Sequence, residues 1–389
     1  MCLKSNNKNI FLRKMAGLYI HIPFCKSRCI YCDFYSTTFP RLQQDYVEAL
    51  CREMRLRNDY IKSDINTIYL GGGTPSQLST ECLQNIFDTI YNEAFNISND
   101  PEVTMECNPD DITPEYAEAI KHLPINRISI GAQTFNDSRL NFLRRRHTSE
   151  QIKNAIDLLR INGFSNISID LMYGFPKESL NEWIDDINKA ISLEVEHISA
   201  YSLMYEEGTP LYNMLKSKDI NEIDEEISRN MYESLIDMLT AVGYKHYEIS
   251  NFALRGYQSK HNSSYWKQIP YIGIGASAHS FNINSRQWNV ANINEYIRSI
   301  TTGEIPSEKE ILTEAMRYND SVFTSLRTSE GLDMNILKER YGERKTCYCL
   351  SMAKPHLDNG RLVIINNHMK LTRTGIFVSD DIMSDLMIV

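Results

Sequence analysis

The chain has 389 residues, a formal net charge of −9 and a pI of about 5.6, and 42% of its residues are hydrophobic. This acidic balance argues against the basic face that a large nucleic-acid footprint requires, so we expect no nucleic-acid partner. No apolar run approaches the roughly 18 residues of a membrane span. The nine cysteines, an odd number and mostly scattered, do not form a disulfide framework, which indicates a reducing, cytoplasmic setting.

The N-terminal residues carry several basic side chains but no apolar segment of the kind found in signal peptides. We therefore expect residues 1–16 to form a loose tail. An apolar, β-prone run follows from Leu18 to Ile22. Pro23 cannot continue a strand ladder, so we expect it to end this first strand and to turn the chain into a loop.

That loop holds three cysteines, Cys25, Cys29 and Cys32, at C-x3-C-x2-C spacing. Structural zinc sites and ordinary four-iron clusters each take four protein ligands, and no fourth cysteine or histidine follows closely. Three thiolates on a [4Fe-4S] cubane leave one iron without a protein ligand, and that iron can bind the amine and carboxylate of S-adenosylmethionine (SAM). A zinc loop and three unrelated thiols are the alternatives that this stretch leaves open.

Two successive motifs resemble those of the radical-SAM superfamily. The first is the cysteine spacing, placed directly after a first strand and with Tyr31 just before the last cysteine. The second is G-G-G-T-P-S, residues 71–76, at the end of a short predicted strand over residues 66–70. Glycines at that end let the backbone pass close to a ligand. The motif is similar to the one that grips the methionine amine of SAM in that superfamily.

Predicted strands and helices alternate along the chain as far as about residue 204. We expect further strands at 101–108, 127–133, 166–173 and 197–204, and a seventh extended segment at 244–252. We expect helices at 42–61, 81–93, 149–162, 179–192 and 224–241. Two more helices are expected, one that begins after Thr113 and one that follows the strand at 127–133 and runs to residues 144–147. This alternation predicts a parallel sheet with helices outside it. Six βα units are too few to close an eight-fold barrel, so we expect an α/β protein with a partial, TIM-like (β/α)6 barrel. Polar groups near the C-terminal strand ends would share one rim with the cysteines.

The chain changes character after the alternating region. Residues 260–281 are rich in glycine, serine and aromatic residues, and the rest of the chain predicts helices near 308–319, 333–341 and 347–357, a hairpin turning at Asn366-Asn367, and a last helix. This order suggests a small α+β, winged-helix-like module that covers the barrel opening or docks a partner. We therefore expect a tail (1–16), a barrel core (17–250), a connecting and barrel-closing segment (251–305) and a C-terminal module (306–389).

Taken together, six motifs resemble the coproporphyrinogen III oxidase-like family of radical-SAM proteins over nearly the whole chain. They are Y-I-H-I-P-F-C-x3-C-x-Y-C-D-F, G-G-G-T-P-S, E-C-N-P, S-I-G-A-Q-T-F, D-L-M-Y-G-F-P and H-N-S-S-Y-W. The oxidase branch carries a further cysteine two residues after the third cluster ligand, where this chain has Phe34. H-N-S-S-Y-W, residues 261–266, is similar to the HemW branch, which is thought to consist of heme chaperones.

The resemblance implies a [4Fe-4S] cluster on Cys25, Cys29 and Cys32, with SAM on its fourth iron. It implies SAM contacts at nine further residues, which are Tyr19, Gly72, Gly73, Thr74, Glu106, Gln133, Arg145, Asp170 and Met204. For the two acids the alternative is a helix cap or a surface position, and for Met204 it is ordinary packing. The resemblance also makes His261 a candidate heme ligand, and the alternative is a loop histidine that is hydrogen-bonded to backbone.

Two functions follow from the resemblance. The first is a heme chaperone that binds heme and transfers it to apo-hemoprotein acceptors, including respiratory, membrane-associated ones, with a homodimer as one carrier state. The second is an oxygen-independent coproporphyrinogen III oxidase of porphyrin biosynthesis, in which SAM is cleaved to a 5′-deoxyadenosyl radical. A radical-SAM enzyme acting on an unrelated small molecule is a third. No role is predicted for the remaining cysteines, which are Cys2, Cys51, Cys82, Cys107, Cys347 and Cys349.

Overall fold

The computed structural model describes residues 15–388, so Cys2 and most of the predicted tail lie outside the described residues. Its main feature is a twelve-stranded sheet in the order β12-β11-β10-β9-β1-β2-β3-β4-β5-β6-β8-β7. Six parallel strands follow the chain order through the middle of this sheet, namely β1 (Met15–Ile22), β2 (Asp64–Gly72), β3 (Ile97–Cys107), β4 (Arg127–Gln133), β5 (Ile167–Tyr173) and β6 (His197–Ser202). All six strands predicted from the alternation are confirmed.

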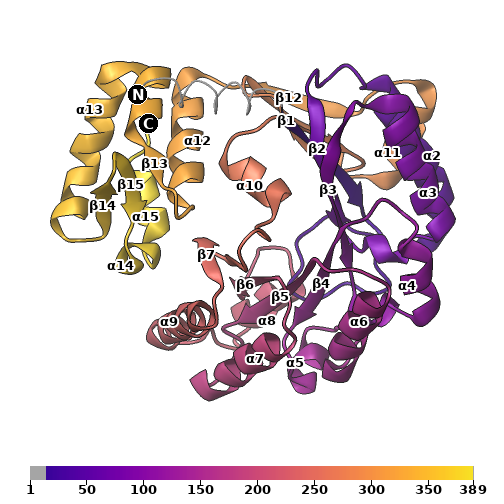
Figure 1. The fold of residues 1–389 in the computed structure, drawn as a ribbon, viewed down its shortest axis with the longest axis horizontal. Coiled ribbons are helices and arrows are strands. Elements are labelled where there is room, and N and C mark those ends of the chain that lie inside the picture. The colour runs from indigo at the N-terminus through magenta and orange to yellow at the C-terminus, as the bar shows by residue number, and fades with distance from the viewer. Residues whose placement is uncertain (1–14, 389) are drawn as a thin grey trace.

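Helices cover the outer face of the parallel strands, and the sheet curves around the inner space (Figure 1). The covering helices are α2 (Gln43–Leu56), α3 (Thr80–Thr89), α4 (Pro114–Ile120), α5 (Asp137–Phe142), α6 (Ser149–Ile161), α7 (Leu180–Ser192) and α9 (Glu225–Ala241), with the short helices η1 (Pro40–Leu42), η2 (Pro75–Gln77), η3 (Ile90–Ala94) and η4 (Pro109–Asp111) in the connections. The helix α8 (Pro210–Lys216) packs instead on the cysteine loop, where the Leu211 N–H donates to the Ile30 carbonyl at 3.0 Å. Because β12 and β7 end the sheet without pairing to each other, the barrel is open. The fold is therefore the partial (β/α)6 barrel that the sequence predicts.

Local sequence explains most of the helix boundaries. Thr113 accepts a hydrogen bond from the backbone N–H of Tyr116, with Pro114 as the first helical residue of α4. Two predicted helices end earlier than expected. The helix predicted over 42–61 stops at Leu56, and the one predicted to reach 144–147 stops at Phe142. In the second case Arg144 adopts a φ of 60°, which no right-handed helix accommodates.

The segment after residue 242 adds strands that the alternation did not reveal. The extended segment predicted over 244–252 is two antiparallel strands, β7 (Lys245–Glu248) and β8 (Asn251–Ala253). The next segment forms α10 (Lys260–Trp266), β9 (Tyr271–Ile274), β10 (His279–Phe281), β11 (Ser285–Asn289) and α11 (Ile293–Thr302). β9 runs parallel to β1, with Gly17 opposite Tyr271, so this segment widens the barrel sheet on the side of its first strand.

The C-terminal region has its own buried cluster, which includes Tyr318, Leu337 and Met369. Its elements are α12 (Glu314–Leu326), β13 (Leu332–Asp333), α13 (Met334–Asp358), β14 (Leu362–Ile365), β15 (His368–Leu371), α14 (Arg373–Ile376) and α15 (Ser379–Asp385). The expected helix near 308–319 is wrong at its start, because β12 (Ser307–Ile311) pairs there with β11. The two helices expected at 333–341 and 347–357 are confirmed as the two helical parts of α13, which are separated at Gly342, where φ is 79° and ψ is 171°.

The α+β character of this region is confirmed, with helices and a small three-stranded sheet in the order β13-β15-β14. β14 and β15 form the predicted hairpin, and its two turn residues, Asn366 and Asn367, both have positive φ, as a two-residue hairpin turn requires. The region packs beside β7 and α9 (Figure 1). Ser329 donates a backbone hydrogen bond to Tyr247, and Arg373 forms an ion pair with Asp237 on α9.

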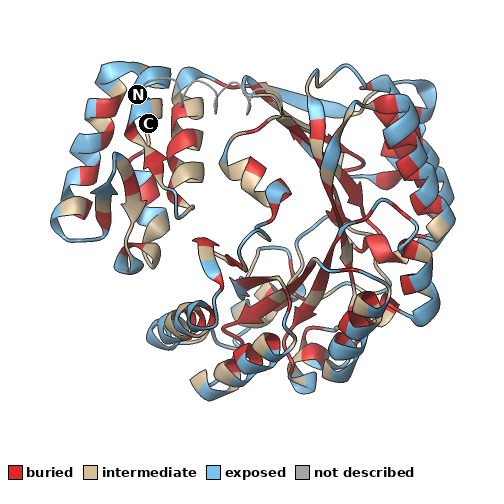
Figure 2. Cartoon of the chain, viewed as in Figure 1, coloured by how far each residue is buried: buried red, intermediate tan, exposed pale blue. Residues whose placement is uncertain are grey.

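Burial follows the layers of the fold. The strands and the sheet-facing sides of the helices are buried, and the outer helix faces are exposed (Figure 2). Among residues 15–388, no helix combines the length and the hydropathy that a membrane crossing requires.

A buried charge network fastens the added strands to the barrel. Glu53 on α2 is fully buried, and its carboxylate accepts hydrogen bonds from the Gly275 N–H, the Asn289 side-chain amide and the Tyr296 hydroxyl at 2.8, 2.8 and 2.6 Å. Arg57 pairs with the same carboxylate at 2.7 Å.

We expect Glu53→Ala to lower the free energy of unfolding by on the order of 3–5 kcal/mol, because it leaves the buried Arg57 charge without a partner. Urea unfolding followed by circular dichroism measures this change. Glu48→Ala, at an exposed position of the same helix, is the matched control. A loss for Glu53→Ala no larger than that of the control would contradict the prediction.

Candidate functional site

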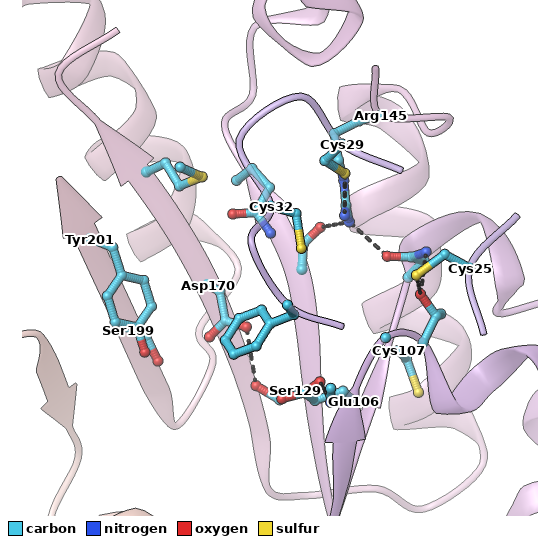
Figure 3. Close-up of a pocket in the computed structure, with 18 of the residues that line it drawn as sticks. Cys25, Cys29, Cys32, Glu106, Cys107, Ser129, Arg145, Asp170, Ser199 and Tyr201 are labelled. Atoms are coloured by element: carbon cyan, nitrogen blue, oxygen red, sulfur yellow. Dashed lines mark hydrogen bonds between the residues drawn. The ribbon is translucent and has the colours of Figure 1, made fainter. Parts of the chain in front are cut away.

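A cavity of about 520 Å³ opens at the C-terminal ends of the parallel strands and continues into the barrel. The cysteine loop between β1 and η1 forms one wall, and the ends of β2 to β6 form the others. Figure 3 shows Cys25, Cys29 and Cys32 around this space, together with Glu106, Arg145 and Asp170. The structure therefore brings together the three cysteines and most of the polar residues that the sequence singled out.

Backbone contacts fix the start of the cysteine loop. The Cys25 N–H donates to the Thr37 carbonyl at 2.9 Å, and the Thr37 N–H donates to the Pro23 carbonyl at 2.7 Å. The three loop thiols are free. Burial raises the pKa of the Cys25 thiol and raises that of Cys32 to about 11. Because thiolates are the ligands of soft metals, loading this loop must release protons and is favoured as pH rises.

Arg145 places a cation against the cysteine loop. One guanidinium nitrogen lies 3.7 Å from the Cys29 sulfur, and the other donates to the Asn108 side-chain oxygen at 2.7 Å and to the Gly131 carbonyl at 2.6 Å. A Cβ at Gly131 would come within 2.9 Å of that guanidinium. The glycine in S-I-G-A-Q therefore makes room for the arginine that faces the thiols.

The glycine motif after β2 lies directly against the end of β1. The Gly73 N–H donates to the Ile22 carbonyl and the Thr74 N–H donates to the Phe24 carbonyl, both at 2.9 Å. A Cβ at Gly73 would lie 2.6 Å from the Ile22 carbonyl oxygen, so only glycine allows this approach. The Thr74 hydroxyl lies 3.6 Å from the Cys25 sulfur. The glycine motif thus forms the part of the cavity wall next to Cys25.

Two carboxyl groups project into the cavity from neighbouring parts of the barrel wall. Glu106 accepts hydrogen bonds from the Tyr69 hydroxyl at 2.7 Å and from the Gly72 N–H at 3.1 Å. Asp170 accepts from the Ser129 hydroxyl at 3.5 Å. Burial raises the pKa of Glu106 to about 7 and that of Asp170 to about 6. Neither acid caps a helix or lies on the outer surface, so both are available to a cationic or hydroxyl-bearing ligand.

The raised pKa of Glu106 yields a stability prediction. Folding raises the pKa of the Glu106 carboxyl, so ionising this group costs free energy in the folded protein. The resulting loss of stability is absent below the pKa of the unfolded chain and becomes complete as pH rises through the folded value of about 7. We expect Glu106→Gln to raise the free energy of unfolding of the ligand-free protein by on the order of 1–2 kcal/mol at pH 8 and by almost nothing near pH 4. Thermal unfolding across pH measures this difference, with the exposed Glu118→Gln as control. A difference that does not depend on pH would contradict it.

Two of the predicted site residues do not line the cavity. The Tyr19 hydroxyl lies 3.0 Å from the Nδ1 atom of His21, and the Tyr19 ring stacks on the ring of Tyr69. His261 is 1% exposed on α10, inside the open side of the barrel. Its Nδ1 lies 2.8 Å from the Thr67 hydroxyl and its Nε2 lies 2.8 Å from the Tyr265 hydroxyl. Both ring nitrogens are occupied, so heme ligation by His261 stays a prediction that this geometry does not favour.

The structure adds site residues that the sequence did not indicate. Tyr69 orients Glu106, Asn108 orients Arg145, and Ser129, Ser199 and Tyr201 line the cavity near Asp170 (Figure 3). Several follow from strand alternation, because Ser129 and Gly131 share a face of β4 with Gln133. Met204, in contrast, is 62% exposed and lies at the mouth of the cavity. Among the described residues, no group of three or more His, Cys, Asp or Glu side chains has the arrangement that holds a single metal ion.

Comparisons with known proteins agree with this architecture. Residues 19–190 match the Radical SAM superfamily, and residues 312–378 match the HemN C-terminal domain. The heme chaperone HemW of Bacillus subtilis (strain 168) is 36% identical over 376 residues, which cover 95% of this chain and 98% of that protein. HemW of Escherichia coli (strain K12) is 37% identical over 266 residues, 68% of this chain and 69% of that protein.

Among solved structures, coproporphyrinogen III oxidase (HemN) from Escherichia coli, a radical-SAM enzyme, has a TM-score of 0.84. The match covers 97% of this chain and 91% of that one at 20% identity, so it shows the shared fold.

The open barrel and its cysteine-lined cavity define a radical-SAM protein. Within that class, the full-length similarity places the chain more narrowly. The chain belongs to the HemW branch of the coproporphyrinogen III oxidase-like family.

Proposed function

We propose that this protein is a heme chaperone, which holds a SAM-liganded [4Fe-4S] cluster, binds heme and transfers it to acceptor proteins. The observation that carries the proposal is the similarity to relatives named heme chaperone HemW, which extends over 95% of the chain for the Bacillus subtilis protein. Phe34 at the position of the oxidase's additional cysteine points the same way.

The residues of the cavity fit the two cofactors. Three free thiols face one space and have a cation beside them, which suits an anionic iron–sulfur cluster. Cys25, Cys29 and Cys32 would hold the cluster, and when bound the cluster supplies an iron with an open coordination position for SAM. We propose two chemical roles for the neighbouring side chains. Glu106 can accept from the SAM amine or ribose, and Arg145 can pair with an anionic group.

The other SAM contacts are proposed from the family resemblance. Gly72, Gly73, Thr74, Gln133 and Asp170 line the same cavity and remain in the proposed set. Tyr19 lies behind Tyr69 and would act through that ring. The described cysteines carry no disulfide, which supports a reducing, cytoplasmic setting. Apo-hemoproteins of respiratory membranes are the proposed acceptors, and a heme-loaded homodimer is the proposed carrier state.

Heme titration is the direct test of this function. Hemin added to the anaerobically reconstituted full chain should give a shifted Soret band that saturates at a defined stoichiometry and survives gel filtration. Serum albumin provides a positive control for the assay and lysozyme a negative one. An unshifted spectrum and no stable complex would contradict the chaperone proposal.

A further inference from the structure

The mouth of the cavity differs in character from its interior. Two large apolar side chains are exposed there, Phe34 at 61% and Met204 at 62%. Phe34 comes two residues after the last cysteine of the loop, and Met204 comes two residues after the end of β6. Exposed apolar side chains next to a ligand cavity indicate a surface that a ligand covers.

Cationic side chains share this mouth. Arg28 and Arg144 both line the cavity and are exposed, and neither guanidinium forms a hydrogen bond or ion pair with a residue in the range 15–388. The φ of 60° at Arg144 belongs to the turn that ends α5, where the Arg145 N–H donates to the Leu140 carbonyl at 2.8 Å. Asp33 and Glu206 also line the mouth, and neither forms an ion pair with these arginines. Among the described residues, the mouth therefore carries two unpaired cations and two unpaired carboxylates beside an apolar surface. The arginines are the groups that could meet the carboxylates of a flat, amphipathic dianion.

The volume of the cavity leaves no room for such a ligand in the cavity interior. The cavity measures about 520 Å³, which is in the range of a single drug-sized ligand. A four-iron cluster with SAM already needs this space, so a porphyrin ring cannot lie inside with them. A tetrapyrrole that binds at this site must therefore lie across the mouth.

The axial ligand can be found by elimination. Two of the chain's nine histidines line the cavity, His147 and His197, and both are buried. His197 has both nitrogens occupied, by Ser168 at 2.7 Å and by Tyr247 at 2.8 Å. The His147 Nε2 lies 3.1 Å from the Ala132 carbonyl, and its Nδ1 has no hydrogen-bond partner among the described residues but is buried, in a residue that is only 3% exposed. Neither ring can reach an iron at the mouth.

Tyr201 and Met204 are the remaining exposed donors near β6, with Tyr201 40% exposed. The Tyr201 hydroxyl lies beside Ser199, on the inner side of the barrel near Asp170 (Figure 3). Its oxygen is therefore directed away from the mouth. The Met204 thioether is a known type of axial ligand to heme iron, and it is the donor whose side chain lies in the opening.

We propose that heme lies across the cavity mouth, with the Met204 sulfur as an axial ligand to its iron, the ring against Phe34 and the propionates near Arg28 and Arg144. This assignment rests on the proposed heme-chaperone function. It removes Met204 from the SAM contacts and gives it to heme. It also explains how one protein holds heme and SAM at the same time, since the two ligands occupy different depths of one opening.

Met204→Leu in the reconstituted full chain is the central test, because leucine keeps the apolar volume and removes the sulfur. Hemin titration should show affinity at least about tenfold weaker and loss of the absorption and magnetic-circular-dichroism features of methionine-ligated ferric heme. Met204→His should restore tight binding with a histidine-type spectrum. Met352→Leu, at an exposed methionine of the C-terminal module, is the matched control and should leave the wild-type spectrum.

The propionate contacts are tested by the double variant Arg28→Gln/Arg144→Gln. Its hemin affinity should fall several-fold and depend less on salt than that of the wild type. Arg41→Gln, at an exposed arginine outside the cavity lining, is the control.

The outcomes separate the two proposals. If the wild type binds no hemin, the chaperone function fails and this site fails with it. If the wild type binds hemin and Met204→Leu keeps its affinity and spectrum, only the ligand assignment is overturned. If Met204→Leu weakens SAM binding in isothermal titration and leaves heme unchanged, Met204 belongs to the SAM contacts.

Discussion

Replacing any one of Cys25, Cys29 and Cys32 by serine is expected to abolish cluster assembly in this protein. The three sulfurs face one cavity, with the Arg145 guanidinium beside Cys29. Cys107 also lines that cavity, but it is a single, buried thiol at the end of β3 and lies outside the cysteine loop. The hard serine hydroxyl is a poor ligand for iron that requires thiolate. SAM affinity should fall by at least about a hundredfold, because without the cluster the SAM amine and carboxylate lose the iron that binds them.

Anaerobic reconstitution measures this effect through iron and sulfide content, the charge-transfer absorption of the cluster and the electron paramagnetic resonance signal after reduction. Cys347→Ser is the matched control, because Cys347 is an exposed thiol on α13. It should load to the wild-type level. A cysteine-loop variant with wild-type iron content and SAM affinity would contradict the assignment of these ligands.

His261→Ala is expected to weaken SAM binding and to leave heme binding in place, the reverse of what a heme ligand would do. The His261 ring stacks on Tyr69 with the centroids 5.0 Å apart, and Tyr69 donates to Glu106 at 2.7 Å. Glu106 in turn accepts from the Gly72 N–H at 3.1 Å. His261 is thus a positioning residue at the base of a chain of contacts that ends at the glycine motif.

The contacts from His261 through Tyr69 to Glu106 set the expected losses of stability and of SAM affinity. Removing the buried ring leaves a cavity, and the free energy of unfolding should fall by about 2–4 kcal/mol. SAM affinity should fall by about tenfold because Tyr69 and Glu106 lose their support, in line with the effect of residues that orient ligand groups. Because His261→Ala is a destabilising change, Tyr69→Phe provides a second variant. It keeps the ring stack and removes only the hydroxyl that orients Glu106, and it should weaken SAM binding to a similar extent.

Isothermal titration with SAM and Soret titration with hemin, made on the same preparations, separate the two roles. His122→Ala is the control, since that side chain is 71% exposed on the surface. Loss of heme binding with unchanged SAM affinity in His261→Ala would restore this residue as the heme ligand.

The barrel is predictable from the sequence because the signals that begin and end each strand and helix lie within or next to that element. Each βα unit carries its own signals, such as the cap at Thr113 and the glycine that follows α6, Gly163, with a φ of 92°. The pairing of β9 with β1 carries no such signal, since Gly17 and Tyr271 are joined only in the folded chain. The strand β12 reads S-E-K-E-I and is exposed along most of its length. Its charges resemble those of a helix, and only its pairing with β11 makes it a strand.

The site is predictable to the extent that its residues belong to contiguous motifs. The cysteine loop and the glycine motif meet because Gly73 contacts the end of β1, and each motif is visible alone. The position of His261 is a different case. Its motif indicated a functional histidine, but the sequence does not show that Thr67 and Tyr265 occupy both ring nitrogens. Such partners come from distant parts of the chain and appear only with the fold.

One measurement tests the central claim that this protein carries heme and does not oxidise a porphyrinogen. The reconstituted full chain is supplied anaerobically with SAM and a reductant, and parallel samples receive coproporphyrinogen III or hemin followed by an apo-hemoprotein. We expect heme to appear in the acceptor, at a rate that Met204→Leu changes and Met352→Leu does not, with no protoporphyrinogen IX in the other sample. Formation of protoporphyrinogen IX together with 5′-deoxyadenosine, and no heme transfer, would contradict the account.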